Sequence, residues 1–120
     1  MLQQHYIYCF ADMDSEVKGQ LPAKGLEHDF SHYARALAHP ARISILLEMI
    51  KSNGVVEGKV VEVEGMSPST VIQHLRELKR SGIIDGRIFG LRSKYWIEKE
   101  ALAQFRQLSF DLFFKLETLA

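Results

Sequence analysis

Cysteine and long hydrophobic runs are nearly absent from this sequence. Cys9 is the only cysteine among 120 residues, so no internal disulfide can form and a reducing, cytoplasmic setting is expected. No apolar run approaches the ~18 residues that span a bilayer, and residues 1–10 lack the basic stretch and apolar core of a secretory signal. We therefore expect a single globular domain in the cytoplasm, with no membrane partner.

A net charge is also lacking, since 15 Lys and Arg side chains balance 15 Asp and Glu. The charge is nevertheless unevenly placed along the chain. Residues 67–99 hold 7 basic against 3 acidic side chains, whereas residues 1–66 hold 6 against 9. Because a local basic field attracts phosphate even when the whole chain is neutral, a nucleic-acid contact is expected within residues 67–99.

The patterns that carry catalysis are missing as well. There is no glycine-rich phosphate loop, nucleophile–base pair or strong metal cluster, so neither an enzyme nor a bound cofactor is expected. His28 and His32 lie four residues apart on a predicted helix, a spacing at which both imidazoles can meet one zinc ion. Glu27, Asp29 or Cys9 would complete that candidate metal site. The alternative is a pair of surface histidines without a ligand.

The stretch from Gly65 to Gly82 carries its own start and stop signals. Ser67 suits a helix N-cap, Pro68 the first helical position, and Gly82 a left-handed C-cap. Apolar residues at helical spacing define one buried stripe, formed by Val71, Leu75 and Leu78. Polar and basic side chains fall elsewhere on the helix, which is typical of a DNA recognition helix. A solvated amphipathic surface helix is the alternative.

Helical periodicity is also present ahead of this stretch. Apolar residues spaced along one helix face predict a helix over residues 27–38, which the proline at position 40 ends. Pro40 then begins a second helix, which Asn53-Gly54 ends. The buried stripe of this second helix is expected to consist of Ile43, Leu46, Leu47 and Ile50.

Residues 1–25 carry no comparable pattern. An apolar, aromatic run at residues 5–10 precedes a polar stretch that contains Gly19, Pro22 and Gly25. A short strand, a helix packed on a partner and a flexible arm all fit this composition. Met13 is a second candidate for the first residue of the chain.

Local propensity and context disagree between Val55 and Glu64. The β-branched run alone favours a hairpin that turns at Glu57-Gly58. A glycine at position 65, followed closely by the cap residue of the next helix, suits instead the tight turn between two helices. We therefore expect residues 59–64 to form a short helix that is held by packing rather than by propensity.

Two β-rich runs follow Gly82. Residues 83–89 and 94–97 flank a polar tip, which predicts a hairpin; a two-residue turn at Asp85-Gly86 is the alternative. The hairpin carries three basic side chains, namely Arg87, Arg92 and Lys94. They are placed either to reach a DNA minor groove or to protect an exposed strand edge.

Residues 98–119 predict one long helix. Its apolar residues cover a broad face, but Phe110 and Phe114 point about 100° away from the middle of that face. A terminal helix needs one apolar face for its own core, so a second face indicates a partner. A second copy of the chain is expected, because two-fold dimers are the commonest assembly. Asp111 on this helix is expected to be solvated.

Two motifs resemble the signatures of a known family. Residues 36–46 are similar to "LADPTRLRIL" and residues 66–75 to "LSQSTVSRHL", both of the ArsR/SmtB-type bacterial transcriptional repressors. Gly90, Arg92 and Tyr95 are similar to the wing of that family. The resemblance implies a mainly α fold with a small β-hairpin (α+β), a winged helix-turn-helix that forms a homodimer through its first and last helices. We expect a single domain that consists of an N-terminal arm (1–25), a winged helix-turn-helix core (26–97) and a C-terminal dimerisation helix (98–120).

The sequence departs from the family at its metal sites and in the recognition helix. The cysteine positions of the family motif "ELCVCDL" fall at Val56 and Gly58, and residues 98–120 contain no histidine. Pro68 and Ile72 replace polar residues that are frequent in the family. We therefore expect a sequence-specific repressor that binds double-stranded DNA and whose inducer, an unidentified small molecule or protein, is not a family-typical metal. A winged-helix module that binds protein through its aromatic last helix is the alternative.

The expected contact residues follow from these arguments. The DNA-binding candidates are Ser67, Ser69, Thr70, Gln73, His74, Arg76, Lys79, Arg80, Arg87, Arg92 and Lys94. His74 is also expected to be hydrogen-bonded at the edge of the core, and base contacts are expected from Ser69, Thr70 and Gln73. The dimerisation candidates are Phe30, Tyr33, Phe105, Phe110, Phe113 and Phe114.

Overall fold

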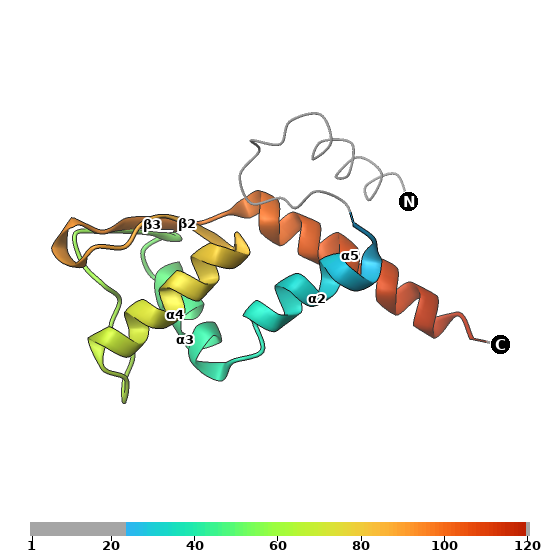
Figure 1. The fold of residues 1–120 in the computed structure, drawn as a ribbon, viewed down its shortest axis with the longest axis horizontal. Helices are drawn as coiled ribbons and strands as arrows, with labels where there is room; N and C mark the ends of the chain where they lie inside the picture. Colours follow the sequence, from blue (N-terminus) through green and yellow to red (C-terminus); the bar gives the residue numbers. More distant parts are fainter. Residues whose placement is uncertain (1–23, 120) are drawn as a thin grey trace.

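The computed structural model describes residues 24–119, so the predictions for residues 1–23 lie outside the described part of the chain. The described elements are α2 (Leu26–Ala36), α3 (Pro40–Ile50), β1 (Val55–Glu57), α4 (Pro68–Ser81), β2 (Ile84–Arg87), the 3-10 turn η1 (Gly90–Arg92), β3 (Lys94–Ile97) and α5 (Lys99–Glu117). Figure 1 shows the β2–β3 hairpin at one end of the molecule and α5 extending toward the other. This arrangement is an α+β winged helix, as predicted.

The boundary between α2 and α3 is set by proline, as predicted. His39 is extended, with φ −132° and ψ 118°, and Pro40 is the first residue of α3. The turn after α3 uses left-handed residues, with φ 61° at Asn53 and φ 79° at Gly54. α2 itself ends at Ala36, two residues before the predicted end at position 38.

The buried face of α3 differs from the predicted one. Ile45 and Met49 are fully buried, whereas Ile43, Leu47 and Ile50 are exposed. Leu46 alone of the predicted stripe packs against the core, where it is partly buried. The cause is that α3 is apolar on nearly every side, so periodicity does not select one face. The contacts of α3 with α4, β1 and β3 determine which of its apolar residues are buried.

The predicted helix at residues 59–64 is wrong, because this segment is irregular and contains no helix. The preceding residues form β1, which pairs antiparallel with β3 so that Val55 lies opposite Trp96 and Glu57 opposite Lys94. The hairpin turning at Glu57-Gly58 is not formed either, since β1 takes its partner from a strand far along the sequence. The start of the β-branched run thus forms a strand with a remote partner, whereas its remainder is irregular.

The hairpin predicted after Gly82 is confirmed. β2 and β3 pair antiparallel with Ile84 opposite Ile97 and Arg87 opposite Lys94, and η1 forms the tip. Asp85 and Gly86 lie within β2, so the alternative turn at these residues does not form. β1 adds a third strand, whose pairing with β3 the sequence patterns do not predict, and the sheet order is β1-β3-β2.

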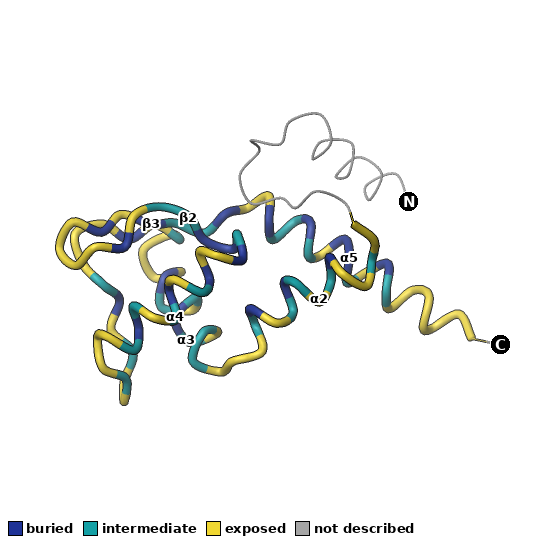
Figure 2. Tube along the Cα trace, viewed as in Figure 1, coloured by how far each residue is buried: buried dark blue, intermediate teal, exposed yellow. Residues whose placement is uncertain are grey.

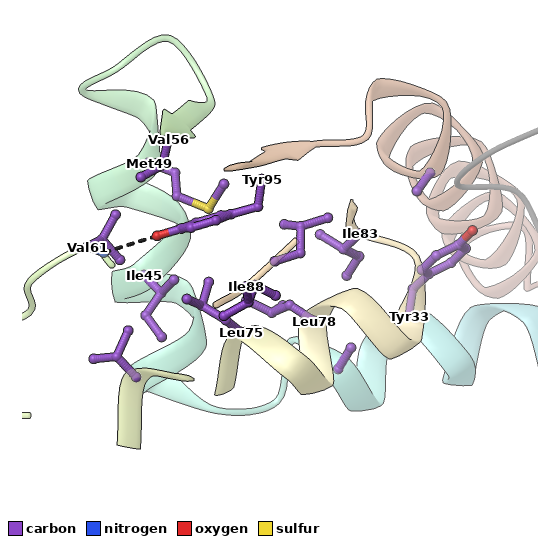
Figure 3. Packing of buried hydrophobic residues seen from close by; sticks show 14 of the residues in the cluster. Tyr33, Ile45, Met49, Val56, Val61, Leu75, Leu78, Ile83, Ile88 and Tyr95 are labelled. Atoms are coloured by element: carbon purple, nitrogen blue, oxygen red, sulfur yellow. Dashed lines mark hydrogen bonds between the residues drawn. The ribbon is translucent and has the colours of Figure 1, made fainter. Parts of the chain in front are cut away.

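Tyr95 joins the sheet to the segment that leads into α4. Its ring lies in the core among Ile45, Met49 and Val61 (Figure 3), and its hydroxyl accepts a hydrogen bond from the backbone N of Val61 at 3.0 Å. Burial raises the pKa of the Tyr95 hydroxyl, although the hydrogen bond from Val61 acts in the opposite direction. The irregular segment before α4 is therefore fixed by one buried hydrogen bond as well as by its valines.

Replacing Tyr95 by phenylalanine is expected to lower the free energy of unfolding by about 1–3 kcal/mol, because the amide of Val61 would stay buried without an acceptor. Urea unfolding followed by circular dichroism measures this change as a lower midpoint with an unchanged slope. An unchanged midpoint would contradict the prediction and would mean that water reaches the Val61 amide.

The last helix, α5, is only half covered by the rest of the chain. Its first part packs on α2, and in Figure 2 its last turns are exposed and project from the body of the molecule. Asp111 is buried, and its Oδ1 accepts a hydrogen bond from Gln107 Nε2 at 3.3 Å. The prediction that Asp111 is solvated is therefore wrong, because the face that periodicity assigns to polar residues also packs. No described helix combines the length and the apolar character needed to cross a membrane.

Candidate nucleic-acid interface

The helix predicted from its caps is α4, and both caps are formed. Ser67 Oγ accepts a hydrogen bond from the backbone N of Thr70 at 3.2 Å and donates one to Thr70 Oγ1 at 2.9 Å. Pro68 is the first helical residue, and Gly82 ends the helix with a left-handed φ of 92°. The predicted stripe is buried and consists of Val71, Leu75 and Leu78. Local capping and one apolar face thus fix the helix and leave its opposite face at the surface.

The surface of α4 carries side chains suited to nucleic acid. Ser69, Gln73 and Arg76 are exposed, and Thr70 is partly buried. Within the described chain, Gln73 and Arg76 form no hydrogen bond or ion pair, so both are available to a ligand. A glutamine amide can form two hydrogen bonds with adenine in the major groove, and an arginine can bind a guanine or a phosphate.

His74 lies at the corner between α3 and α4. Its Nδ1 accepts a hydrogen bond from Arg42 Nε at 3.2 Å, and its ring centroid is 5.0 Å from that of His39. Partial burial, followed by the charges of Arg42 and His39, lowers the pKa of His74. A neutral imidazole is the form that can accept from Arg42, so His74 holds α4 against the start of α3. Arg42 is not among the predicted site residues, because its partner lies 32 residues away.

A basic groove runs between α4 and the β2–β3 hairpin. It has a volume of about 850 Å³, and its basic lining residues are Lys79, Arg87, Arg92 and Lys94. Arg87 Nε donates a hydrogen bond to the backbone O of Arg92 at 3.1 Å, which joins one strand to the tip of the hairpin. Glu57 is the acidic residue of the lining. The groove brings together one cation of α4 and all three predicted cations of the hairpin.

The two histidines of the candidate metal site bind other groups. His32 Nε2 donates a hydrogen bond to the backbone O of Ser81 at 2.8 Å, and His28 Nδ1 lies 3.2 Å from Asp29 Oδ1. His32 therefore ties α2 to the end of α4. Among residues 24–119, no three His, Cys, Asp or Glu side chains are grouped so that they could hold a metal ion. Cys9 lies outside this range.

The dimerisation candidates fall into two sets. Phe30, Tyr33 and Phe105 pack together inside the chain, with ring centroids 5.2 Å apart for Phe30 and Phe105 and 5.6 Å for Tyr33 and Phe105. Tyr33 is fully buried and its hydroxyl donates to Gln104 Oε1 at 2.6 Å, so its side chain packs within this chain. The other set is exposed near the end of α5 and consists of Phe110, Phe113 and Phe114.

Comparison with known proteins agrees with this geometry. The chain is 34% identical over 68 residues to the HTH-type transcriptional regulator YgaV of Escherichia coli (strain K12), and the matched segment covers 57% of this chain and 69% of YgaV. No protein-family model and no solved structure matches the chain. Similarity over most of the length of YgaV, together with a capped surface helix beside a basic hairpin, shows that the chain belongs to the helix-turn-helix transcriptional regulators.

Proposed function

We propose that this protein is a sequence-specific transcriptional repressor of the ArsR/SmtB type, which binds a two-fold DNA operator as a homodimer. The observation that carries the proposal is the juxtaposition of α4 and the basic groove. The polar surface of α4 is accessible, and four cations line the groove beside it. Base edges and backbone phosphates are the two ligands that such a surface can contact together.

In the proposed complex, the first turns of α4 enter the major groove. Ser69, Thr70 and Gln73 face the bases, while Pro68 lacks an N–H and donates no hydrogen bond. Arg87, Arg92 and Lys94 on the hairpin contact phosphates or the neighbouring minor groove. Specificity therefore depends on few side chains, and Gln73 is the one with the largest hydrogen-bonding capacity.

The proposed inducer is not a metal bound in the positions that the family uses. Val56 and Gly58 occupy the two cysteine positions of the family motif, and neither side chain can ligate a metal. Val56 is moreover buried in the core within β1. An effector of another chemical class, a small molecule or a protein, fits this chain better.

The exposed phenylalanines of α5 favour one other function, a winged-helix module that binds a protein partner. Salt dependence separates the two functions. Binding to a fragment of the gene's own promoter is expected to weaken steeply between about 50 and 200 mM salt, in proportion to the phosphates contacted. If the purified protein shows no salt-sensitive retention of this fragment, the repressor function is abandoned in favour of the protein-binding module.

Replacing Gln73 by alanine is expected to cost about 1–3 kcal/mol of binding free energy at the specific operator and to leave non-specific binding nearly unchanged. The reason is that Gln73 is exposed on α4 and forms no hydrogen bond within the described chain that the substitution would remove. Fluorescence anisotropy with operator and scrambled duplexes measures both affinities. An equal decrease on both duplexes would contradict a role of Gln73 in base contact.

A further inference from the structure

A second cationic surface lies on the flank of α4 opposite the basic groove. It is a cavity of about 200 Å³ formed by α2, the start of α3 and the end of α4. Ser81 lines this cavity, whereas Lys79 lines the basic groove. Residues two apart on a helix point about 200° away from each other. The two surfaces therefore border the exposed face of α4 on its two sides.

Three arginines from three different helices line this cavity. Arg35 belongs to α2, Arg42 to α3 and Arg80 to α4. Glu77 is the acidic residue of the lining, and it forms an ion pair with Arg80. Among the described residues that line the cavity, the guanidinium groups thus outnumber the carboxylates three to one, which favours an anionic ligand.

The arginines have hydrogen-bond donors to spare. Within residues 24–119, the guanidinium of Arg35 forms no hydrogen bond or ion pair. Arg42 donates through Nε to His74 and through Nη1 to the backbone O of Ala36 at 3.2 Å. These two bonds fix the guanidinium and leave three of its five N–H groups for a ligand.

Two other polar residues that line the cavity, His32 and Ser81, form hydrogen bonds within the protein. His32 Nε2 donates to the backbone O of Ser81 at 2.8 Å, and Ser81 Oγ donates to the backbone O of Leu78 at 2.7 Å. These bonds do not use the arginine N–H groups, which therefore remain available to a ligand that enters from solvent.

Helix dipoles explain only part of this arrangement. Arg35 and Arg80 lie in the last turns of α2 and α4, where a cation is favourable. Arg42 lies instead in the first turn of α3, where a cation is unfavourable. The dipoles therefore do not account for the convergence of all three arginines on one cavity.

We propose that this cavity takes a backbone phosphate of the bound DNA, on the side of the major groove opposite the hairpin. The inference rests on the proposed function. A helix that lies in the major groove has a phosphate backbone on each side, and α4 has cations on each of its flanks. The arginine cavity and the basic groove thus contact the two strands, and arginine forks match the geometry of phosphate oxygens.

The test compares salt dependence in Arg35→Ala/Arg80→Ala with that in Lys99→Ala, an exposed cation outside both surfaces. The double variant is expected to bind any duplex roughly tenfold more weakly at about 0.1 M salt. The slope of log K against log salt is expected to fall by about one for each phosphate that the protein no longer binds. The control is expected to keep the slope of the unmodified protein. Arg42 is left in place because it also anchors α4, and unfolding midpoints verify that each variant is folded.

Glu77→Gln removes a negative charge from the cavity, whereas the double variant removes two positive charges. Removing the carboxylate of Glu77 from the cavity is expected to tighten binding to any duplex several-fold, which a purely structural role of the arginines would not produce. An unchanged slope in the double variant, with DNA binding otherwise intact, overturns the inference and leaves the proposed function standing. Absence of DNA binding in the unmodified protein overturns both the inference and the proposed function.

Competition with inorganic phosphate tests whether the cavity binds a phosphate of DNA or a free phosphate anion. At constant ionic strength, millimolar phosphate is expected to compete with DNA more strongly in the unmodified protein than in the double variant. If phosphate raises the unfolding midpoint of the unmodified protein while the double variant keeps its DNA slope, the cavity binds a free anion and the inference is overturned.

Discussion

Replacing Gly86 by alanine is expected to destabilise the protein by about 2–5 kcal/mol, a larger effect than we expect from the other single substitutions. A Cβ on residue 86 would lie 2.2 Å from the backbone O of Lys94 and 2.6 Å from the Cα of Tyr95. Both are backbone atoms of the paired strand, so no side-chain rotation relieves the contact. The φ of 124° adds strain of about 1–3 kcal/mol for an L residue, and the overpacking adds a similar amount.

Gly58→Ala is the matched control for this prediction. Gly58 also has a positive φ, 82°, but nothing lies within 4 Å of the position that its Cβ would take. The control therefore measures backbone strain alone, and we expect it to cost no more than about half as much as Gly86→Ala. Denaturant unfolding of both variants gives the comparison. Equal decreases in stability would contradict the argument that the close approach of β2 and β3 excludes a side chain at residue 86.

The elements that could be predicted from the sequence are those whose signals are local. Ser67, Pro68 and Gly82 each act within a few residues of the helix end that they define, and the structure has each of them in the predicted role. The hairpin is likewise set by two neighbouring runs and a short tip. Accordingly, the sequence alone places α4 and the β2–β3 hairpin, which carry nearly all the DNA-binding candidates.

The elements that could not be predicted depend on remote partners. Val61 donates to a hydroxyl 34 residues away, and β1 pairs with a strand some 40 residues further along the chain. A single-sequence pattern contains no information on such pairings. The helix expected at residues 59–64 from the turn-like glycine that follows them therefore does not form, although the β-branched run itself favours strands. The buried face of α3 differs from the prediction for a related reason. This helix carries apolar residues on nearly every side, so its tertiary contacts determine which of them are buried.

The same distinction applies to the candidate site. The cations of α4 and the hairpin are neighbours in sequence, so the sequence identifies them as a group. Arg35, Arg42 and Arg80 come from three helices and converge only when α2, α3 and α4 pack. The sequence therefore does not predict that these three arginines lie together, and only the folded structure shows it.

The aromatic end of α5 offers the strongest test of the proposed dimer. The side chains of Phe110 and Phe114 are 51% and 58% exposed, and their rings stack with centroids 6.0 Å apart. Two further exposed apolar residues follow, Leu116 in the last turn of α5 and Leu119 just beyond the helix. Since a contiguous apolar surface of this kind usually marks an interface, the double variant Phe110→Glu/Phe114→Glu is expected to sediment as a monomer. The monomer is expected to stay folded, because neither side chain is part of the core.

Disrupting the dimer is expected to weaken operator binding by about 10²- to 10⁴-fold, because two linked half-site contacts become independent. Leu47→Glu/Ile50→Glu is the matched control, since Leu47 and Ile50 on α3 are 57% and 58% exposed. This control is expected to remain a dimer and to keep its affinity for the operator. A dimeric α5 variant would contradict the proposed interface, and a monomeric α3 variant beside it would move the interface to α3. Sedimentation velocity and operator titration on the same samples therefore decide which apolar surface joins the two copies.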